Sequence, residues 1–131
     1  MKIYNTYSRQ LEDFQPIEPG KVKMYVCGPT VYNYIHVGNA RSVVAFDLVR
    51  KYLEFRGFEV QYISNFTDVD DKIINGAKAA NMTTTDFSER YIAAFYEDTD
   101  ALNVKRASQN PKATEFIEAM IEFIQELVDK E

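Results

Sequence analysis

The stretch VKMYVCGPTVYNYIHVGNARSVVAFDLVRKYLEFRGFEVQYI, residues 22–63, decides the fold. Residues 22–27 alternate loosely and end in apolar side chains, which predicts a moderately buried strand. Residues 58–63 alternate apolar and polar side chains and predict a second strand. A long helix is expected between them, over about residues 38–56. A strand, a helix and a strand within about forty residues are typical of a parallel βαβ crossover.

The ends of these elements carry the expected signals. Gly28-Pro29 ends the first strand, because proline fixes φ and lacks an amide donor. Gly57 stands where the C-terminal cap of the helix is expected. The apolar side chains of the helix share one stripe, which we expect to be buried. That stripe contains Val44, Leu48, Tyr52 and Phe55, widened by Ala45, Val49 and Leu53.

The flanking sequence predicts one further strand and three helices. A short strand is expected over residues 2–7, before a turn region that contains Pro16, Pro19 and Gly20. Helices are expected over 69–80 and 86–101, the second capped by Thr85. The last helix is expected to start at Asn110-Pro111, with Asn as cap and Pro in the first turn. Its apolar face is expected to pack on its own domain or, in an isolated fragment, to be partly exposed and to drive association. That face contains Ala113, Phe116, Ile117, Met120, Ile121, Ile124, Leu127 and Val128.

Composition excludes several classes of protein. The 131 residues hold 15 Lys and Arg against 20 Asp and Glu, a net charge of −5, which argues against nucleic-acid binding by bulk charge. The single Cys excludes an intrachain disulfide and favours a reducing compartment. No apolar run approaches the roughly 20 residues that cross a bilayer. We therefore expect a cytoplasmic protein without a membrane partner.

Residues 27–41, CGPTVYNYIHVGNAR, lie between the first parallel strand and its helix. Ligands of open α/β sheets bind beyond the carboxyl ends of the strands, and helix N-termini favour phosphate. Gly38 would allow a flat or charged ligand to approach the helix closely. His36 and Asn39 are three residues apart, so both can donate hydrogen bonds to phosphate oxygens. A histidine before a helix is more often a cap or a packing residue than a ligand-binding residue. The residues alone leave both the structural role and the ligand-binding role of His36 open.

The chain also resembles a known family. His36-Val37-Gly38-Asn39 is similar to the first signature motif, His-Ile-Gly-His, of class I aminoacyl-tRNA synthetases. Residues 27–32 (CGPTVY) and 65–74 (NFTDVDDKII) resemble the cysteinyl-tRNA synthetases in particular, as do Ile3-Tyr4-Asn5-Thr6 and residues 100–103 (DALN). The resemblance covers essentially the whole chain. It implies an α/β, Rossmann-like class I synthetase catalytic domain, here partial, with a parallel βαβ unit followed by helices.

The implied activity is a two-step ligation. The carboxylate of cysteine attacks the α-phosphate of ATP, with Mg²⁺, and the cysteinyl group then passes to the terminal ribose of tRNA(Cys). By the resemblance, His36 and Asn39 are catalytic residues that hold the phosphates, and Gly38 lets adenine pack on the helix. Asn39 departs from the second His of the usual motif, so it can donate a hydrogen bond but carry no charge. ATP is further expected to contact Pro29 and Thr30.

The resemblance also assigns the amino-acid pocket. Cys27 would be one ligand of a Zn²⁺ ion that binds the substrate thiolate, which would separate cysteine from serine. Gly28 and Thr67 match positions that line the pocket. The family's other zinc ligands, a second Cys, a His and a Glu, come from later in the protein. This sequence has no second Cys, and its only His is already assigned to the phosphate motif. The Lys-Met-Ser-Lys-Ser loop and the anticodon-binding region of the family are absent from it as well. We therefore expect a fragment of a monomeric enzyme that lacks full activity by itself.

The expected division is an ATP- and cysteine-binding part over residues 1–75 and a helical segment over 76–131 that leads into the connective insertion. The acidic residues Asp68, Asp70 and Asp71 are expected to complement a helix N-terminus rather than to bind metal. Two other functions stay open at this point. One is a cysteine ligase that acts on a sugar amine in mycothiol synthesis, and the other is a truncated chain that binds nucleotide or RNA without catalysis.

Overall fold

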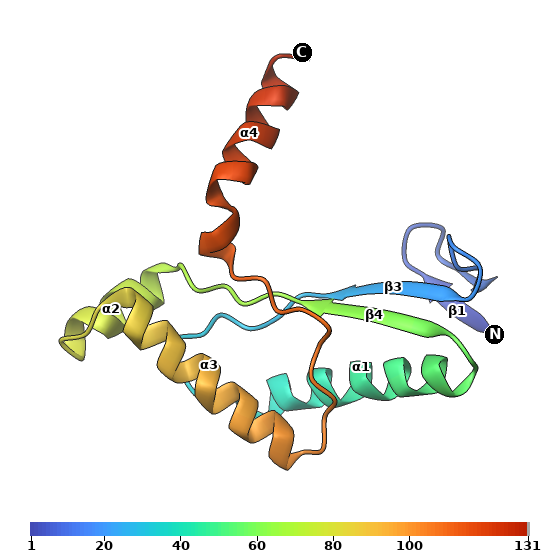
Figure 1. Cartoon of the computed structure of the whole chain (residues 1–131), viewed down its shortest axis with the longest axis horizontal. Helices are drawn as coiled ribbons and strands as arrows, with labels where there is room; N and C mark the ends of the chain where they lie inside the picture. The colour runs from blue at the N-terminus through green and yellow to red at the C-terminus, as the bar shows by residue number, and fades with distance from the viewer. Residues whose placement is uncertain (131) are drawn as a thin grey trace.

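The computed structural model describes residues 1–130 (Figure 1). Helix α1 lies along one side of the strands β3 and β4, and helix α4 projects away on the other side. Within the described residues, no helix is both long and apolar enough to span a membrane. In chain order the elements are β1 (Lys2–Asn5), β2 (Gln10–Asp13), β3 (Lys21–Val26), α1 (Val37–Phe55), β4 (Glu59–Ser64), α2 (Asp71–Ala79), α3 (Thr84–Ala101), the 3₁₀ turn η1 (Ala113–Phe116) and α4 (Ile117–Val128).

The predicted βαβ unit is confirmed. Strands β3 and β4 are parallel, in a register that runs from Lys21 opposite Glu59 to Val26 opposite Ser64, and α1 connects them. Gly57 has a φ of +88°, the left-handed conformation that a helix cap of this kind requires. On the sheet face toward α1, a small apolar cluster forms from Val22, Leu53, Val60 and Tyr62.

A third extended segment lies along β4, where the sequence predicted the start of the last helix. The amide of Ser108 donates to the carbonyl of Tyr62 at 2.7 Å, and the amide of Phe66 donates to the carbonyl of Pro111 at 2.8 Å. The two β-bridges that this segment forms, Gln109 with Ile63 and Lys112 with Phe66, are parallel. The prediction of a helix capped by Asn110 is therefore wrong: the open edge of β4 offers hydrogen bonds that hold this segment extended.

The N-terminal strand is shorter than predicted and belongs to a hairpin. Strand β1 ends at Asn5 and pairs antiparallel with β2, which the sequence analysis did not identify. The turn between them uses Arg9 at φ 58°, a left-handed conformation that no glycine signals here. Because β2 (QLED) shows no clear apolar alternation, the pattern contained little indication of it.

The predicted bounds of the long helix are confirmed, but of its predicted apolar stripe only Leu53 is buried. Leu48 and Phe55 are 68% and 84% exposed, and the rest of the central stripe is exposed as well. The buried residues of α1 are Asp47, Arg50 and Leu53. This face is inward because the loop after α3 crosses α1 and offers backbone groups to polar side chains. Thus Arg50 donates to the carbonyl of Arg106 at 2.7 Å, and Asp47 accepts from the amide of Lys105 at 3.1 Å.

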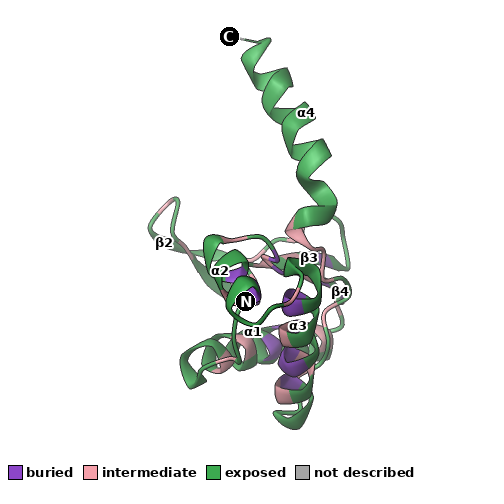
Figure 2. Cartoon of the chain, turned by 90° about the vertical axis from the view of Figure 1, so that its left-hand side faces the viewer, coloured by how far each residue is buried: buried purple, intermediate pink, exposed green. Residues whose placement is uncertain are grey.

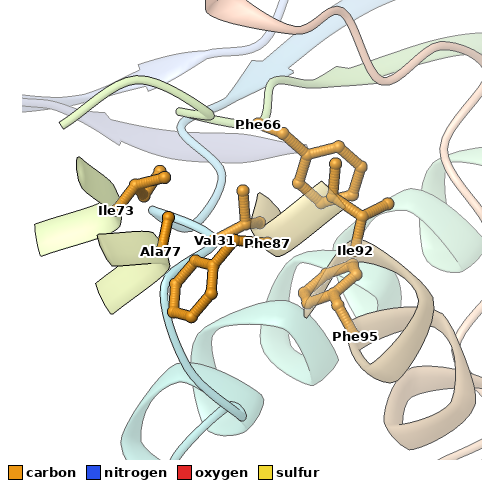
Figure 3. Close-up of a cluster of buried hydrophobic side chains, with 7 residues drawn as sticks. All are labelled: Val31, Phe66, Ile73, Ala77, Phe87, Ile92 and Phe95. Carbon is orange, nitrogen blue, oxygen red and sulfur yellow. The ribbon is translucent and has the colours of Figure 1, made fainter. Parts of the chain in front are cut away.

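Helices α2 and α3 pack through the larger apolar cluster (Figure 3). Gly76 lies in this contact, where a Cβ would come within 2.5 Å of the Phe87 ring, so a glycine inside α2 permits the close approach. The N-cap of α3 is Thr83, not the predicted Thr85, and its hydroxyl accepts from the amide of Asp86 at 3.0 Å. The cluster consists of Val31, Phe66, Ile73, Ala77, Phe87, Ile92 and Phe95.

Helix α4 does not pack as predicted. Figure 2 shows it exposed along its whole length, and its apolar face is open to solvent. Its N-cap, Phe116, makes no side-chain cap hydrogen bond. Within residues 1–130 this face does not pack on its own domain, and the exposure matches what was expected of an isolated fragment. The periodicity correctly indicated a helix, but periodicity does not show which surface covers an apolar face.

Candidate functional site

The candidate site lies where β3 and β4 end. After Val26 the chain leaves regular structure, then pairs once more where the amide of Thr67 donates to the carbonyl of Pro29 at 3.1 Å. Next, the amide of Val31 donates to the carbonyl of Thr67, also at 3.1 Å. The carboxyl ends of two parallel strands thus stay joined just beyond Cys27 and Gly28. This is the edge at which open α/β sheets bind ligands.

Gly28 is fixed by close contact with the neighbouring strand. A Cβ at this position would lie 1.7 Å from the carbonyl oxygen of Asn65. The amide of Gly28 donates to the side-chain oxygen of Asn65 at 2.9 Å. No side chain larger than hydrogen fits here without a backbone shift, so Gly28 brings the two strand ends together.

His36 and Asn39 form a reciprocal capping box at the N-terminus of α1. The Nδ1 atom of His36 accepts from the amide of Gly38 at 3.2 Å, and Oδ1 of Asn39 accepts from the amide of His36 at 3.3 Å. Because Nδ1 is occupied as an acceptor, Nε2 is the ring nitrogen that is left to contact a ligand. Of the two roles left open for His36, the cap is thus present in the structure.

The capping box leaves hydrogen-bond donors for a ligand. Neither Nε2 of His36 nor Nδ2 of Asn39 donates to another group within residues 1–130. The first turn of α1 carries no acidic residue that would repel an anion. Gly38 is not sterically required by the chain itself, since a Cβ there would lie 3.5 Å from His36 Nδ1, an ordinary contact. The helix start can therefore receive an anionic ligand.

Two adjoining cavities open at this edge. Cys27 and Gly28 line a cavity of about 130 Å³, which also lies against α1 and α3. Thr30 and His36 line a second cavity, of about 310 Å³. Pro29, Asn39 and Phe95 border both cavities, whereas Gly38 and Thr67 line neither. The structure thus brings six of the predicted site residues to two adjoining cavities.

Cys27 is a free, exposed thiol. Its Sγ lies 3.8 Å from the carbonyl oxygen of Gly28. Among residues 1–130, no group of three or more His, Cys, Asp or Glu side chains could hold a metal ion. The donor set described here fits one ligand position of a zinc site and does not form a closed one.

The acidic residues after β4 have structural roles. Asp70 caps α2 by accepting from the amide of Lys72 at 2.8 Å, and Asp71 lies in its first turn, as predicted. Asp68 differs, because it accepts from the amide of Thr114 at 3.0 Å and from its hydroxyl at 2.5 Å. It thereby fixes the chain at the base of α4, a long-range role that its neighbours in sequence did not indicate.

Charged and aromatic groups at the smaller cavity were not predicted. Arg106 forms an ion pair with Asp100 at 2.6 Å and lies over the Tyr96 ring. Its guanidinium group, by donating to Asp100, lowers the pKa of that carboxyl. Burial raises the pKa of the Tyr96 phenol, which donates to Asn110 at 3.0 Å. These residues come from α3 and the following segment, so only the folded chain brings them to the cavity.

Comparison with known proteins identifies this domain as a class I aminoacyl-tRNA synthetase catalytic domain. The family model described as "tRNA synthetases class I (C) catalytic domain" matches residues 13–131, and the chain belongs to this family. Within it, the chain is 88% identical over all 131 residues to a cysteine–tRNA ligase of Lactococcus lactis subsp. cremoris. It is 60% identical over its full length to the cysteine–tRNA ligase of Latilactobacillus sakei subsp. sakei. It spans 29% and 28% of these two relatives.

Solved structures show the same fold at low sequence identity. The methionyl-tRNA synthetase of Mycobacterium tuberculosis, in complex with methionyl-adenylate, matches with a TM-score of 0.66 at 19% identity. That match covers 72% of this chain and 18% of the synthetase. A LeuRS from Agrobacterium radiobacter, in a ternary complex with tRNA and LeuAMS, matches with a TM-score of 0.69 at 20% identity, over 90% of this chain and 16% of that one. These likenesses confirm the predicted partial Rossmann-like fold.

Proposed function

We propose that this chain supplies the first part of the catalytic domain of a cysteine–tRNA ligase. The whole protein would activate cysteine with ATP and transfer it to tRNA(Cys). The observation that carries the proposal is the identity of 88% to a cysteine–tRNA ligase across every residue of the chain. The site geometry supports it, because an anion-accepting helix start and a free thiol lie at one sheet edge. The sugar-amine ligase and the non-catalytic chain are not favoured by these relatives.

His36 and Asn39 would bind the ATP phosphates in this function. In the first step, a carboxylate oxygen of cysteine attacks the α-phosphorus, and pyrophosphate leaves. Charge builds on the phosphate oxygens, and hydrogen-bond donors held in place beforehand stabilise it. The capping box holds the His36 ring and the Asn39 amide in position before ATP arrives. Pro29 and Thr30 would border the nucleotide, and the missing side chain of Gly38 would leave room for adenine.

Cys27 would contribute one thiolate to a zinc ion, with its other ligands supplied by residues outside this chain. Zinc prefers sulfur and would lower the pKa of a bound substrate thiol. Gly28 and Thr67 would border the cysteine substrate beside it. An exposed thiol at the end of β3 supports this assignment, since the side chain is accessible to a ligand.

The same proposal includes the metal that accompanies ATP, the oligomeric state, the location of the enzyme and the division of the chain into two parts. Mg²⁺ would accompany ATP, and the enzyme would act as a monomer in the cytoplasm. Residues 1–75 would form the ATP- and cysteine-binding part, and residues 76–131 would lead into an insertion. The apolar cluster that contains Phe66 and Phe87 joins these two parts through packing.

Cysteine-dependent exchange of pyrophosphate into ATP tests the proposal in a full-length ligase that carries this segment. We expect exchange with cysteine and at least about a hundredfold less with serine, because oxygen is a poorer zinc ligand than sulfur. Aminoacylation of tRNA(Cys) follows as the second assay. Exchange that does not depend on cysteine, or a folded full-length protein with none, would contradict the proposed function.

A further inference from the structure

Asn65 joins two residues of the candidate site, Gly28 and Thr67, and also contacts Tyr25 of β3. It lies directly after β4, and its Oδ1 accepts from the amide of Gly28 at 2.9 Å and from the hydroxyl of Tyr25 at 3.0 Å. Its Nδ2 donates to the hydroxyl oxygen of Thr67 at 3.4 Å. The side chain therefore connects the loop after β3 with the chain after β4.

The orientation of this amide follows from its partners. The backbone N–H of Gly28 can only donate, so the atom that faces it must be the Asn65 oxygen. The nitrogen then faces Thr67 and occupies one acceptor position of the hydroxyl. The hydroxyl keeps its own O–H and one lone pair, since Thr67 Oγ1 has no other hydrogen bond within residues 1–130.

The same residues follow the two parallel strands directly. Cys27 comes immediately after β3, and Asn65 comes immediately after β4 with Thr67 two positions further on. These side chains therefore lie at the carboxyl ends of the strands, where open α/β sheets bind ligands. Asn65 thus acts at the strand ends that carry the Cys27 thiol.

We propose that Asn65 is a positioning residue that orients the Thr67 hydroxyl toward the amino group and carboxylate of the cysteine substrate. This inference rests on the proposed function. By donating to Thr67, Asn65 leaves the hydroxyl proton free to point outward to the substrate carboxylate, and a lone pair free for the ammonium group. The Gly28 N–H already donates to Asn65 Oδ1, so this amide holds the loop in place and does not bind substrate.

A double-mutant cycle in a full-length ligase tests the inference. In Asn65→Asp the carboxylate still accepts from Gly28 and Tyr25, but it also accepts the Thr67 hydroxyl proton and turns it away from substrate. We expect the KM for cysteine in pyrophosphate exchange to rise about tenfold, with an unchanged KM for ATP. In a Thr67→Val background, the same Asn65→Asp change should alter the KM for cysteine by less than about twofold. The added charge is present in both backgrounds, so the difference isolates the hydroxyl.

Tyr25→Phe is the matched control. It removes one donor to Asn65 Oδ1 while leaving Gly28 and Thr67 in place, and we expect its KM for cysteine to stay within about twofold of wild type. The inference is overturned if Asn65→Asp raises both KM values equally, leaves the KM for cysteine unchanged, or has the same effect in both backgrounds. A wild-type enzyme without cysteine-dependent exchange overturns the proposed function and this inference with it.

Discussion

Gly28 approaches Asn65 so closely that a Cβ on the glycine would lie 1.7 Å from the asparagine carbonyl oxygen. The two residues are 37 positions apart and belong to the ends of the parallel strands β3 and β4. Their contact, together with the Asn65 side chain, sets the spacing of the chain segments that carry Cys27 and Thr67. Several experiments follow from this arrangement.

Gly28→Ala is expected to destabilise the chain by about 1–3 kcal/mol, because the added methyl group forces the strand ends apart. Urea unfolding of the 131-residue chain measures this. Gly38→Ala is the matched control, since its Cβ would make only an ordinary contact and alanine favours the helix. We expect Gly38→Ala to be at least as stable as wild type. Equal stability of both variants would show that the strand ends move apart at little cost.

His36→Asn is expected to separate the two roles of His36. Asparagine is a good N-cap, so the helix keeps its stability, but the variant loses the Nε2 donor. We expect pyrophosphate exchange by the full-length ligase to fall about a hundredfold with an unchanged melting temperature. His36→Ala should lose both the cap and the Nε2 donor, and the missing cap should lower the free energy of unfolding by about 1 kcal/mol. Full activity in His36→Asn would leave His36 with the capping role alone.

Cys27→Ser is expected to lower zinc content and cysteine affinity together in the full-length ligase, because a serine hydroxyl is a poor zinc ligand. Metal analysis of the purified protein and the KM for cysteine measure the two effects. The isolated chain should hold no stoichiometric zinc, since residues 1–130 contain no cluster of metal ligands. Unchanged zinc stoichiometry in the variant, or a one-to-one site in the isolated chain, would contradict the ligand assignment.

Glu54 is expected to contribute to a loss of stability in acid. The Lys105 ammonium donates to its carboxylate at 2.8 Å, and the Arg50 guanidinium donates at 3.1 Å, which lowers the pKa of Glu54 below its ordinary value of 4.5. A lowered folded-state pKa stabilises the fold above the ordinary pKa, and this contribution disappears as the pH falls through the lowered value.

Urea unfolding of Glu54→Gln between neutral pH and about pH 3 tests this. We expect a lower stability than wild type at neutral pH and a smaller further loss in acid, so the two curves converge. Glu118→Gln serves as the control, because Glu118 forms no ion pair among the described residues. A constant difference between Glu54→Gln and wild type across this range would rule out the proposed contribution.

The sequence by itself determined the central βαβ unit and the place of the site. The alternation in β4, the Gly57 cap and the break at Gly28-Pro29 are local signals, and the structure contains each as predicted. The motif that begins at His36 identified the family, and the comparisons confirm it. The strand, cap and break signals depend on backbone preferences within a few residues, so the local sequence expresses them directly, whereas the family follows from the resemblance of the motif.

Only the tertiary structure decided which surfaces and edges these elements use. The segment after α3 is extended because its amides and carbonyls pair with the chain along β4, and Ser108 lies 46 residues from its partner Tyr62. A different part of the same segment, the backbone of Lys105 and Arg106, binds Asp47 and Arg50 on the inner side of α1 and leaves Leu48 outside. Asn65 acquired its three partners in the same way. Such hydrogen bonds join residues that are distant in sequence, and no local periodicity encodes them because their energy depends on the position of the second chain segment.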